Sequence, residues 1–468
     1  MAGGMPIQTG QIAGSYLTGR ALIFPLSLVI SLFFLWGFSY GLLDVLNKHF
    51  QTVLGITKLE STGLQVMYFG GGYLLFSPIA AESLKRRGYK FTILMGLCLY
   101  SLGAISFWPT AHFTTYEKRK AAFGGFCVCT LVIACGLATL ETAANSYAVV
   151  IGNPASASAR LQFCQAWNGV ASFIGPLIAA KYFFSGENAN SLTNVQFVYL
   201  AVACAGAAVA VLFLVVKMPE VSDEDLSEDP ATAADSLATD EFSRGVGAGP
   251  LYKQYNMIFA FIAQFCYVGA QVTIASFFIN YATENASYSS TQASNFLSYA
   301  LIAFTVGRFV ATALATIFQS DFLLIIYAAL AIGLNTYLCI GHGTPAVAVL
   351  ITIFFFEAPM YPTIFAMGTA NLGRHTRRGA GILVMGVSGG AIFPPIQGAI
   401  ADSAGIRISY IVPLCGFVYV LGYVVTHWLR NGRHVLCVKE VVAVMADTPR
   451  KSVDQSVERL EDVSLQKE

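Results

Sequence analysis

Residues 136–145 read Gly-Leu-Ala-Thr-Leu-Glu-Thr-Ala-Ala-Asn and lie inside an apolar run from roughly Ala121 to Val150. Such a run would place Glu141 at the centre of a bilayer, where an acidic side chain costs about 2.5 to 3.5 kcal/mol and usually faces a cavity. Because burial favours the neutral form of a carboxyl group, Glu141 is predicted to carry a proton. Asn145 follows on the same helical face and can bind whatever the cavity holds. The alternative is that Glu141 only bonds a neighbouring helix.

The composition of the chain indicates an all-α membrane protein. Of its 468 residues, 56% are hydrophobic and 11% are charged, whereas soluble domains carry roughly 25% charged residues. Apolar runs of about 20 residues recur along the chain, so we expect twelve transmembrane helices. These begin near Ala21, Thr62, Phe91, Ala121, Leu161, Val195, Met257, Gln292, Phe322, Ala346, Gly379 and Ser409.

Charge and cysteine usage exclude several classes of function. A net charge of +1 without a basic soluble face argues against nucleic acid as a partner. The ten cysteines are scattered and have no CxxC or histidine spacing, which predicts neither a metal site nor a disulfide framework. The chain also lacks a nucleophile-base pair and a phosphate-binding glycine loop, so we expect no enzymatic activity.

Basic residues in short loops predict the orientation in the membrane. The strongest basic clusters are residues 85–90 and 374–378, and an even number of spans puts both clusters and both termini on the cytoplasmic side. Residues 118–120 read Lys-Arg-Lys and are the exception, since they would lie outside. We therefore expect a multi-pass protein of the plasma membrane with cytoplasmic termini.

The chain divides into two similar halves around one long polar segment. Glu141 and Glu357 interrupt apolar sequence 216 residues apart, which indicates a weak internal repeat. Two six-helix halves with a long middle loop are typical of secondary transporters that bind substrate and coupling ion near the midplane. The predicted parts are a cytoplasmic tail (1–20), a six-helix half (21–218), an acidic cytoplasmic linker (219–252), a second six-helix half (253–430) and a cytoplasmic tail (431–468).

Polar side chains in the first span suggest a substrate with hydroxyl groups. Trp36, Tyr40 and Asp44 are spaced by four residues and therefore share a helical face. Aromatic surfaces beside a carboxylate suit a polyhydroxylated ring, whose C–H face packs on the aromatics while its hydroxyls donate to the acid. The alternative is an interfacial aromatic belt with Asp44 near the outer membrane surface.

Amides and a tyrosine in later spans complete the predicted substrate site. Their alternative role is hydrogen bonding between helices, at about 0.6 kcal/mol each. These residues are Gln165 and Asn168 in the fifth span, Gln264 and Gln271 in the seventh, and Tyr361 in the tenth. Arg308 is a permanent cation in an apolar run and needs a partner. We predict that it forms a structural ion pair with Glu357.

Several of these residues belong to motifs that resemble a known family. The motifs are Phe33-Phe34-Leu35-Trp36, Leu140-Glu141-Thr-Ala-Ala-Asn145, Ala263-Gln264-Phe265-Cys266-Tyr267-Val268-Gly269-Ala270-Gln271 and Tyr361-Pro362-Thr363-Ile364-Phe365. They resemble the fucose:proton symporter family of the major facilitator superfamily, from about Leu22 to Leu429. The resemblance implies the major facilitator fold, with Asp44 and Glu141 in sugar binding and proton coupling. It also implies that Trp36, Gln165, Asn168 and Tyr361 lie in the sugar cavity.

The sequence thus predicts a monomeric importer that moves a monosaccharide together with a proton by alternating access, without a cofactor. Tyr40, Gly41 and Leu43 stand where the family carries asparagines, which favours a second hypothesis, an exporter of a small metabolite. A third hypothesis is a sensor that binds a sugar without moving it. The acidic middle segment and the long tail favour a fungal relative.

Overall fold

The computed structural model describes residue 17 and residues 20–54, 63–114, 119–178, 193–219 and 250–436. Within these ranges the side chains of a few residues, including Asp44, are not described. The predicted linker and most of the two predicted tails lie outside the described residues.

The N-terminal half is a bundle of long helices. Its elements are α1 (Arg20–Leu54), the π-helix η1 (Val66–Leu74), α3 (Leu75–His112), α4 (Arg119–Val150), η3 (Pro154–Ser156), α5 (Ala157–Ile178) and α6 (Thr193–Val215). Within α3 the backbone of Gly88 has φ 80° and ψ −178°, which separates two helices in this one element. A positive φ is readily adopted by glycine, so Gly88 permits the sharp turn between the second and third spans.

The C-terminal half contains more breaks. Its elements are η6 (Leu251–Lys253), α9 (Tyr255–Ser276), α10 (Phe278–Ala286), α11 (Ser290–Leu314), α12 (Ser320–Ile340), α13 (Gly343–Glu357), α14 (Met360–Thr369), η7 (Gly373–His375), α15 (Thr376–Met385), η8 (Gly386–Ser388), α16 (Gly389–Ala404), α17 (Ile406–Ser409) and α18 (Ile411–Arg430). The tenth span is divided into α13 and α14 at Pro359, whose ring cannot donate a backbone hydrogen bond. In the described chain there is no strand, and one isolated bridge joins Phe318 to Leu436.

The number of spans agrees with the sequence. The described residues hold ten helical stretches that are long and apolar enough to cross a membrane. One of them, Gly63–His112, is 50 residues long and contains the turn at Gly88, so it accounts for two spans. The 22-residue α5 is outside those ten and is the remaining span. The prediction of an all-α membrane protein with twelve spans is confirmed.

Buried basic side chains hold several helix ends in place. Arg160, at the start of α5, donates to the carbonyl oxygens of Ala148 (3.0 Å), Val149 (2.7 Å) and Gly152 (3.1 Å). These carbonyls lie at the end of α4, where the helix supplies no donors of its own. The guanidinium therefore fixes the angle between α4 and α5.

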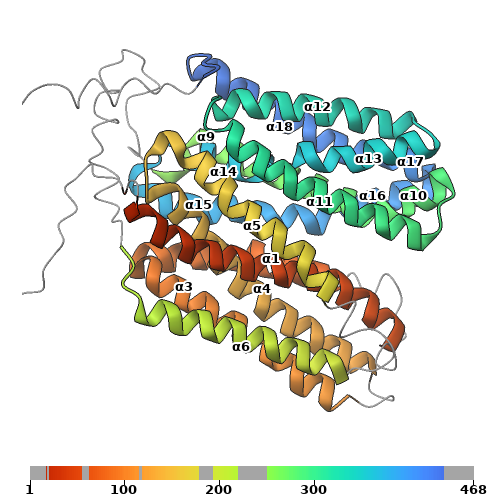
Figure 1. The fold of residues 1–468 in the computed structure, drawn as a ribbon, viewed down its shortest axis with the longest axis horizontal. Helices are drawn as coiled ribbons and strands as arrows, with labels where there is room; N and C mark the ends of the chain where they lie inside the picture. The colour runs from red at the N-terminus through yellow and green to blue at the C-terminus, as the bar shows by residue number, and fades with distance from the viewer. Residues whose placement is uncertain are drawn as a thin grey trace, which may run out of the picture.

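The two halves lie side by side, with α1 to α6 in one body and α9 to α18 in the other (Figure 1). They meet where α5 packs against α11 and α14, and where α3 packs against α15. Small residues allow these approaches. A Cβ on Gly381 would collide with Ala81, and a Cβ on Gly169 would lie 3.1 Å from Thr305 Oγ1.

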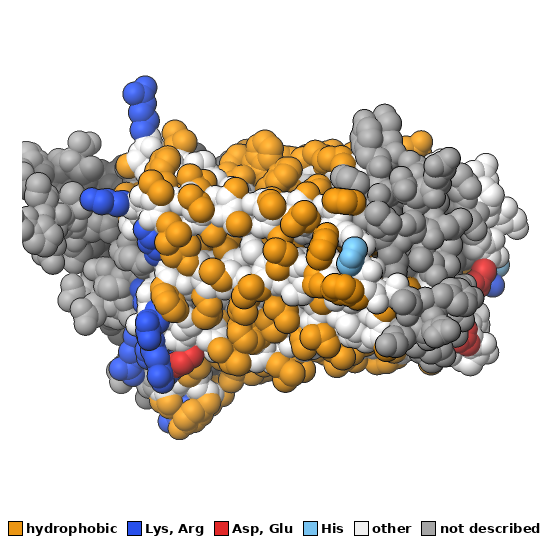
Figure 2. All heavy atoms as spheres, turned by 90° about the horizontal axis from the view of Figure 1, so that it is seen from below, with side chains coloured by type: hydrophobic (Ala, Val, Ile, Leu, Met, Phe, Trp, Pro, Cys, Tyr) orange, Lys and Arg blue, Asp and Glu red, His pale blue; other side chains and the backbone are white. Residues whose placement is uncertain are grey.

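One end of the bundle is basic. Arg378, from the second basic cluster, forms an ion pair with Glu82 (2.7 Å), beside the first cluster, so the two clusters lie at the same end. Figure 2 shows Lys and Arg side chains gathered at this end and a wide hydrophobic band beside it. The band is the surface expected to face lipid.

Candidate functional site

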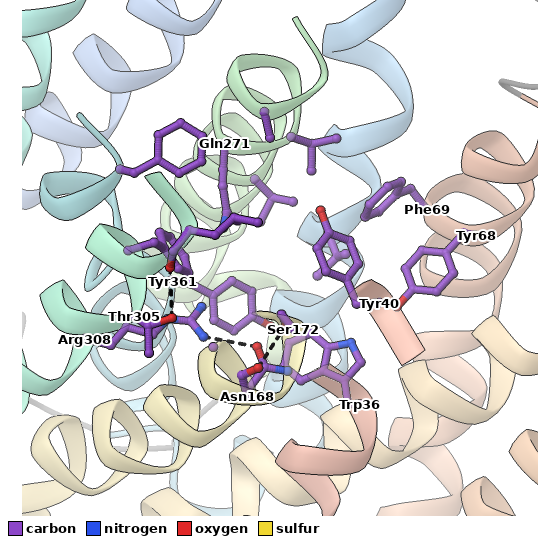
Figure 3. A pocket seen from close by; sticks show the side chains of 18 of the residues that line it. Trp36, Tyr40, Tyr68, Phe69, Asn168, Ser172, Gln271, Thr305, Arg308 and Tyr361 are labelled. Atoms are coloured by element: carbon purple, nitrogen blue, oxygen red, sulfur yellow. Dashed lines mark hydrogen bonds between the residues drawn. The ribbon is translucent and has the colours of Figure 1, made fainter. Parts of the chain in front are cut away.

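A central cavity lies between the two halves and is open on one side. Its unoccupied space, including the part open to solvent, is about 840 Å³. It is lined by Trp36, Tyr40, Tyr68, Phe69, Tyr73, Asn168, Gly169, Ser172, Val268, Gln271, Val272, Ala275, Leu301, Phe304, Thr305, Arg308, Phe354, Tyr361 and Val387. Figure 3 shows Trp36, Tyr40, Tyr68 and Phe69 on one side of this space and Gln271, Thr305 and Arg308 on the other.

The wall formed by the N-terminal half is aromatic. The ring of Tyr40 lies 6.3 Å from the rings of both Tyr68 and Phe69, measured between centroids. Trp36 Nε1 and the hydroxyls of Tyr68 and Tyr73 are buried and have no hydrogen bond of good geometry to a described residue. This wall therefore offers ring faces together with polar groups that can bind a ligand.

Asn168 and Arg308 connect the halves at the edge of the cavity. Arg308 Nη1 donates to Asn168 Oδ1 (3.1 Å) and to the carbonyl oxygen of Gln165 (2.5 Å), and its guanidinium lies 4.5 Å from the ring centroid of Phe304. Asn168 Nδ2 donates to the carbonyl oxygen of Phe33 at 3.2 Å. Among the described lining residues, Arg308 is the charged one.

Glu141 is buried directly behind the cavity wall. Its side chain is 2% exposed, and its Oε1 accepts a hydrogen bond from the hydroxyl of Tyr361, which does line the cavity. Asn145 Nδ2 donates to the same oxygen (3.4 Å) and to the Tyr361 hydroxyl (3.2 Å). Tyr361 therefore links the cavity in one half to the buried acid in the other.

The halves are also joined on the basic side of the cavity. Gln162 Nε2 donates to the carbonyl oxygen of Pro359 (2.7 Å) and to Thr363 Oγ1 (2.8 Å), while Arg377 donates to the carbonyl oxygen of Leu84 (3.3 Å). Along α5, Gln162 precedes Asn168, which lines the cavity. These contacts thus lie between the cavity and the basic end.

Comparison with known proteins identifies the family of this chain. A model described as Major Facilitator Superfamily matches residues 27–385. The chain belongs to the major facilitator superfamily. The expected fold and the resemblance stated above are confirmed, and the family and its relatives are transporters, not enzymes.

The similar proteins include two that are named as sugar transporters and a solved transporter of this superfamily. The chain is 31% identical over 406 residues to the "Glucose/galactose transporter" of Brucella abortus biovar 1, covering 86% of this chain and 93% of that protein. It is 30% identical over 422 residues to the "L-fucose-proton symporter" of Escherichia coli K12, covering 86% and 92%. A crystal structure of the superfamily transporter FucP, described as in the outward conformation, has a TM-score of 0.73 and 30% identity, covering 87% of this chain and 99% of that one.

The structure of this superfamily member brings most of the sequence-predicted residues together. Trp36, Tyr40, Asn168, Gln271 and Tyr361 line the cavity. Three others do not line it: Asn145, Gln165 and Gln264. The side chain of Asp44 lies outside the described residues.

The three residues that do not line the cavity are buried behind it. Gln165 Nε2 donates to Asn145 Oδ1 at 3.4 Å, so these two amides belong to the network around Glu141. Both polar atoms of the Gln264 side chain lack a hydrogen-bond partner among the described residues, and this side chain packs beside Gly386. Direct contact of these amides with a substrate stays a prediction, since they do not line the cavity in this conformation.

The predicted ion pair between Arg308 and Glu357 is not formed. Arg308 donates instead to oxygens of Gln165, Asn168 and Ala358, the last at 3.4 Å. Neither carboxyl oxygen of Glu357 has a hydrogen-bond partner in the described part of the chain. The sequence could not reveal this arrangement, because the competing acceptors for Arg308 come from α5 in the other half.

Several lining residues were missed by the sequence analysis. Tyr68, Phe69 and Tyr73 belong to the π-helix η1, and Ser172 and Thr305 carry short hydroxyl side chains that are common in apolar helices. The spacing of Tyr68, Phe69 and Tyr73 is the one available signal, and the three positions together do not follow the 3.6-residue period of an α-helix. A π-helix has i→i+5 hydrogen bonds and often occurs at functional sites, but sequence pattern does not predict it.

Proposed function

We propose that this protein imports a monosaccharide together with a proton across the plasma membrane by alternating access. The observation that carries the proposal is the hydrogen bond from Tyr361, in the cavity wall, to the buried carboxyl of Glu141. The printed names of the relatives, which specify glucose, galactose and a fucose-proton symport, support the same substrate class and coupling ion.

The cavity wall suits a sugar ring. Trp36 and Tyr40 present ring faces to the C–H face of a pyranose, and Trp36 Nε1 can donate to one of its hydroxyls. On the opposite wall, Gln271 supplies an amide, and Asn168 lies between the two walls. Several weak polar contacts around an apolar surface are typical of small-molecule sites.

Glu141 would couple the sugar to the proton. A proton from the outside neutralises the carboxylate and so removes a buried charge that resists movement of the two halves. A sugar hydroxyl beside Tyr361 competes for the hydrogen bond of that phenol and so links occupancy of the cavity to the charge on Glu141. We propose Asp44 as a second coupling acid, on the basis of its place in the sequence.

The proposed orientation places the basic end of the bundle in the cytoplasm. Both termini then lie in the cytoplasm, and the cavity is the part that opens to the outside. One chain contains both halves of the cavity, so we propose that the monomer transports in the lipid bilayer.

The proposal is tested with purified protein in proteoliposomes that contain a pH dye. Addition of D-glucose, D-galactose or L-fucose outside should acidify the lumen as the sugar enters. If sugar is taken up but none of the three sugars moves protons, symport with protons is excluded.

Glu141→Gln separates coupling from transport. The amide has the size of the carboxylic acid but cannot release a proton, so the variant should still exchange labelled for unlabelled sugar across the membrane. Accumulation against a gradient should fall to the level of empty liposomes. Uphill accumulation by this variant would remove Glu141 from the coupling role.

The apolar wall of the C-terminal half supports a second candidate function. Val268, Val272, Ala275 and Leu301 line the cavity and offer no hydrogen bonds from their side chains. They would suit a metabolite that has one apolar face, moved outward in exchange for a proton. In a strain lacking the protein, accumulation of an endogenous compound together with normal sugar uptake would favour this exporter over the importer.

A further inference from the structure

Glu357 is a second buried carboxyl group, and the proposed function leaves it unused. It is the last residue of α13, its side chain is 0% exposed, and neither carboxyl oxygen has a hydrogen-bond partner among the described residues. Its backbone carbonyl accepts from the hydroxyl of Tyr267 at 2.8 Å. An ionised carboxylate without donors is costly in such a place, so Glu357 holds a proton in this conformation.

Glu141 differs from Glu357 at one of its two carboxyl oxygens, since its Oε2 also lacks a hydrogen-bond partner among the described residues. Its Oε1 accepts hydrogen bonds from Tyr361 and Asn145, and such donors stabilise an ionised carboxylate. Tyr361 follows Glu357 across the short break at Pro359, where α13 ends and α14 begins, so this short stretch of chain separates the two acids. In this conformation the structure thus favours the charge on Glu141 and the proton on Glu357.

Arg308 acts electrostatically on both acids. Its Nε donates to the carbonyl oxygen of Ala358, the residue after Glu357 (3.4 Å), and its Nη1 donates to the carbonyl oxygen of Gln165, whose side chain bonds Asn145 beside Glu141. If both acids were ionised, the buried set would carry one uncompensated negative charge. If both were neutral, Arg308 would be the uncompensated charge. The group is balanced when one acid is ionised, because an unpaired buried charge is destabilising.

The other titratable groups around Glu357 are phenols, which stay neutral. Tyr267 on α9 donates to the backbone of Glu357, and Tyr410, before α18, is within electrostatic reach of its carboxyl. On α12, Tyr327 packs on Phe355 and Phe356, and on α10, Tyr281 donates to the carbonyl oxygen of Leu338. The described cation beside Glu357 is Arg308 on α11, which donates to the carbonyl oxygen of the next residue, Ala358.

We propose that Glu357 is a second proton-binding site of the transport cycle, linked to Glu141 through the charge of Arg308. When Glu141 takes up a proton from the outside, Arg308 loses its balancing charge, and Glu357, which does not line the cavity, releases its proton to the cytoplasmic side. When Glu141 releases its proton to the cytoplasm, Glu357 binds one from the same side, so each cycle moves one proton inward. This inference rests on the proposed proton-coupled function and adds a site to it.

The test compares wild type, Glu357→Gln and Glu357→Asp in proteoliposomes with whichever of D-glucose, D-galactose and L-fucose the wild type accumulates. In Glu357→Gln the neutral amide cannot ionise, so protonation of Glu141 leaves Arg308 unbalanced. Uphill uptake should therefore need a roughly tenfold higher proton concentration, a shift of about one pH unit toward acid in its half-maximum. Glu357→Asp keeps an ionisable group and should keep the wild-type profile. Sugar exchange measures whether each variant is folded and cycling.

Two results would overturn the inference alone. The first is a Glu357→Gln profile that superimposes on the wild type, since Glu357 would then be permanently neutral. The second is loss of sugar exchange in both Glu357→Gln and Glu357→Met while Glu357→Asp retains it, which would make the carboxyl structural. A wild type that accumulates no sugar would instead overturn the proposed function, and this inference with it.

Discussion

Trp36 gives the cavity an indole ring and an N–H group that makes no hydrogen bond of good geometry to a described residue. Trp36→Phe keeps an aromatic surface and removes the donor together with the second ring of the indole. Loss of one hydrogen bond of about 0.5 to 1.5 kcal/mol should raise the KM for sugar uptake roughly two- to tenfold. The value of kcat should change less, because the substitution does not alter the contacts between the two halves that change during transport.

Trp167→Phe is the matched control for this prediction. Trp167 is 36% exposed and packs edge-on against Phe163 and Phe309, outside the cavity. Its KM should stay at the wild-type value. Equal KM values for the two variants would mean that the Trp36 indole N–H does not bind the sugar.

The sequence identifies single residues well when their chemistry conflicts with their surroundings. Glu141 and Arg308 are conspicuous because a charge in an apolar run requires an explanation. Tyr68 and Tyr73 are not conspicuous, since tyrosines are ordinary in membrane helices. The hydrogen-bond partners of Arg308 could not be predicted either, because a sequence does not show which helix of the other half supplies an acceptor.

At the scale of the helix, the pair α1 and α5 depends on Gly37. A Cβ at this position would collide with the backbone carbonyl of Asn168, which cannot move aside as a flexible side chain can. Gly37→Ala should therefore destabilise the protein by about 1 to 3 kcal/mol and lower its melting temperature in detergent.

Gly124→Ala on α4 is the control for helix propensity. A Cβ at Gly124 meets nothing within 4 Å, so this variant should melt at or slightly above the wild-type temperature. Similar melting temperatures for the two variants would contradict close contact between α1 and α5.

The helices themselves were largely predictable. Length and hydropathy give the spans because lipid leaves a helix few alternatives. The break between α13 and α14 coincides with Pro359, which sequence can locate. The π-helical turn η1 was not predictable, because it depends on how residues 66–74 pack against α4 and η8.

At the scale of the molecule, contacts across the basic end hold the halves together. Glu82 bonds Arg86 on its own helix and Arg378 on the other half, at 2.6 and 2.7 Å. Both pairs are partly exposed, so each is worth about 0.2 to 1 kcal/mol. Arg378→Gln should thus shift the equilibrium roughly 1.4- to fivefold toward a conformation open at the basic end.

Arg86→Gln removes a partner of the same carboxylate within one half and should leave this equilibrium unchanged. The measurement is the rate at which a membrane-impermeant thiol reagent labels a single cysteine placed at Thr363, in a background without other cysteines. Thr363 is 4% exposed and lies in the contact between the halves. The same acceleration of labelling by both variants would show that the cross-half ion pair has no special role.

The contact of α5 with α11 at Gly169 has a mechanical consequence. Thr305 leaves almost no clearance there, so the two helices touch at this point. A tilt of one half against the other that keeps this contact must turn about it, and it opens one mouth of the cavity as it narrows the opposite one. Atoms farther from this contact move more, so a substrate near it shifts least and the two ends of the bundle shift most.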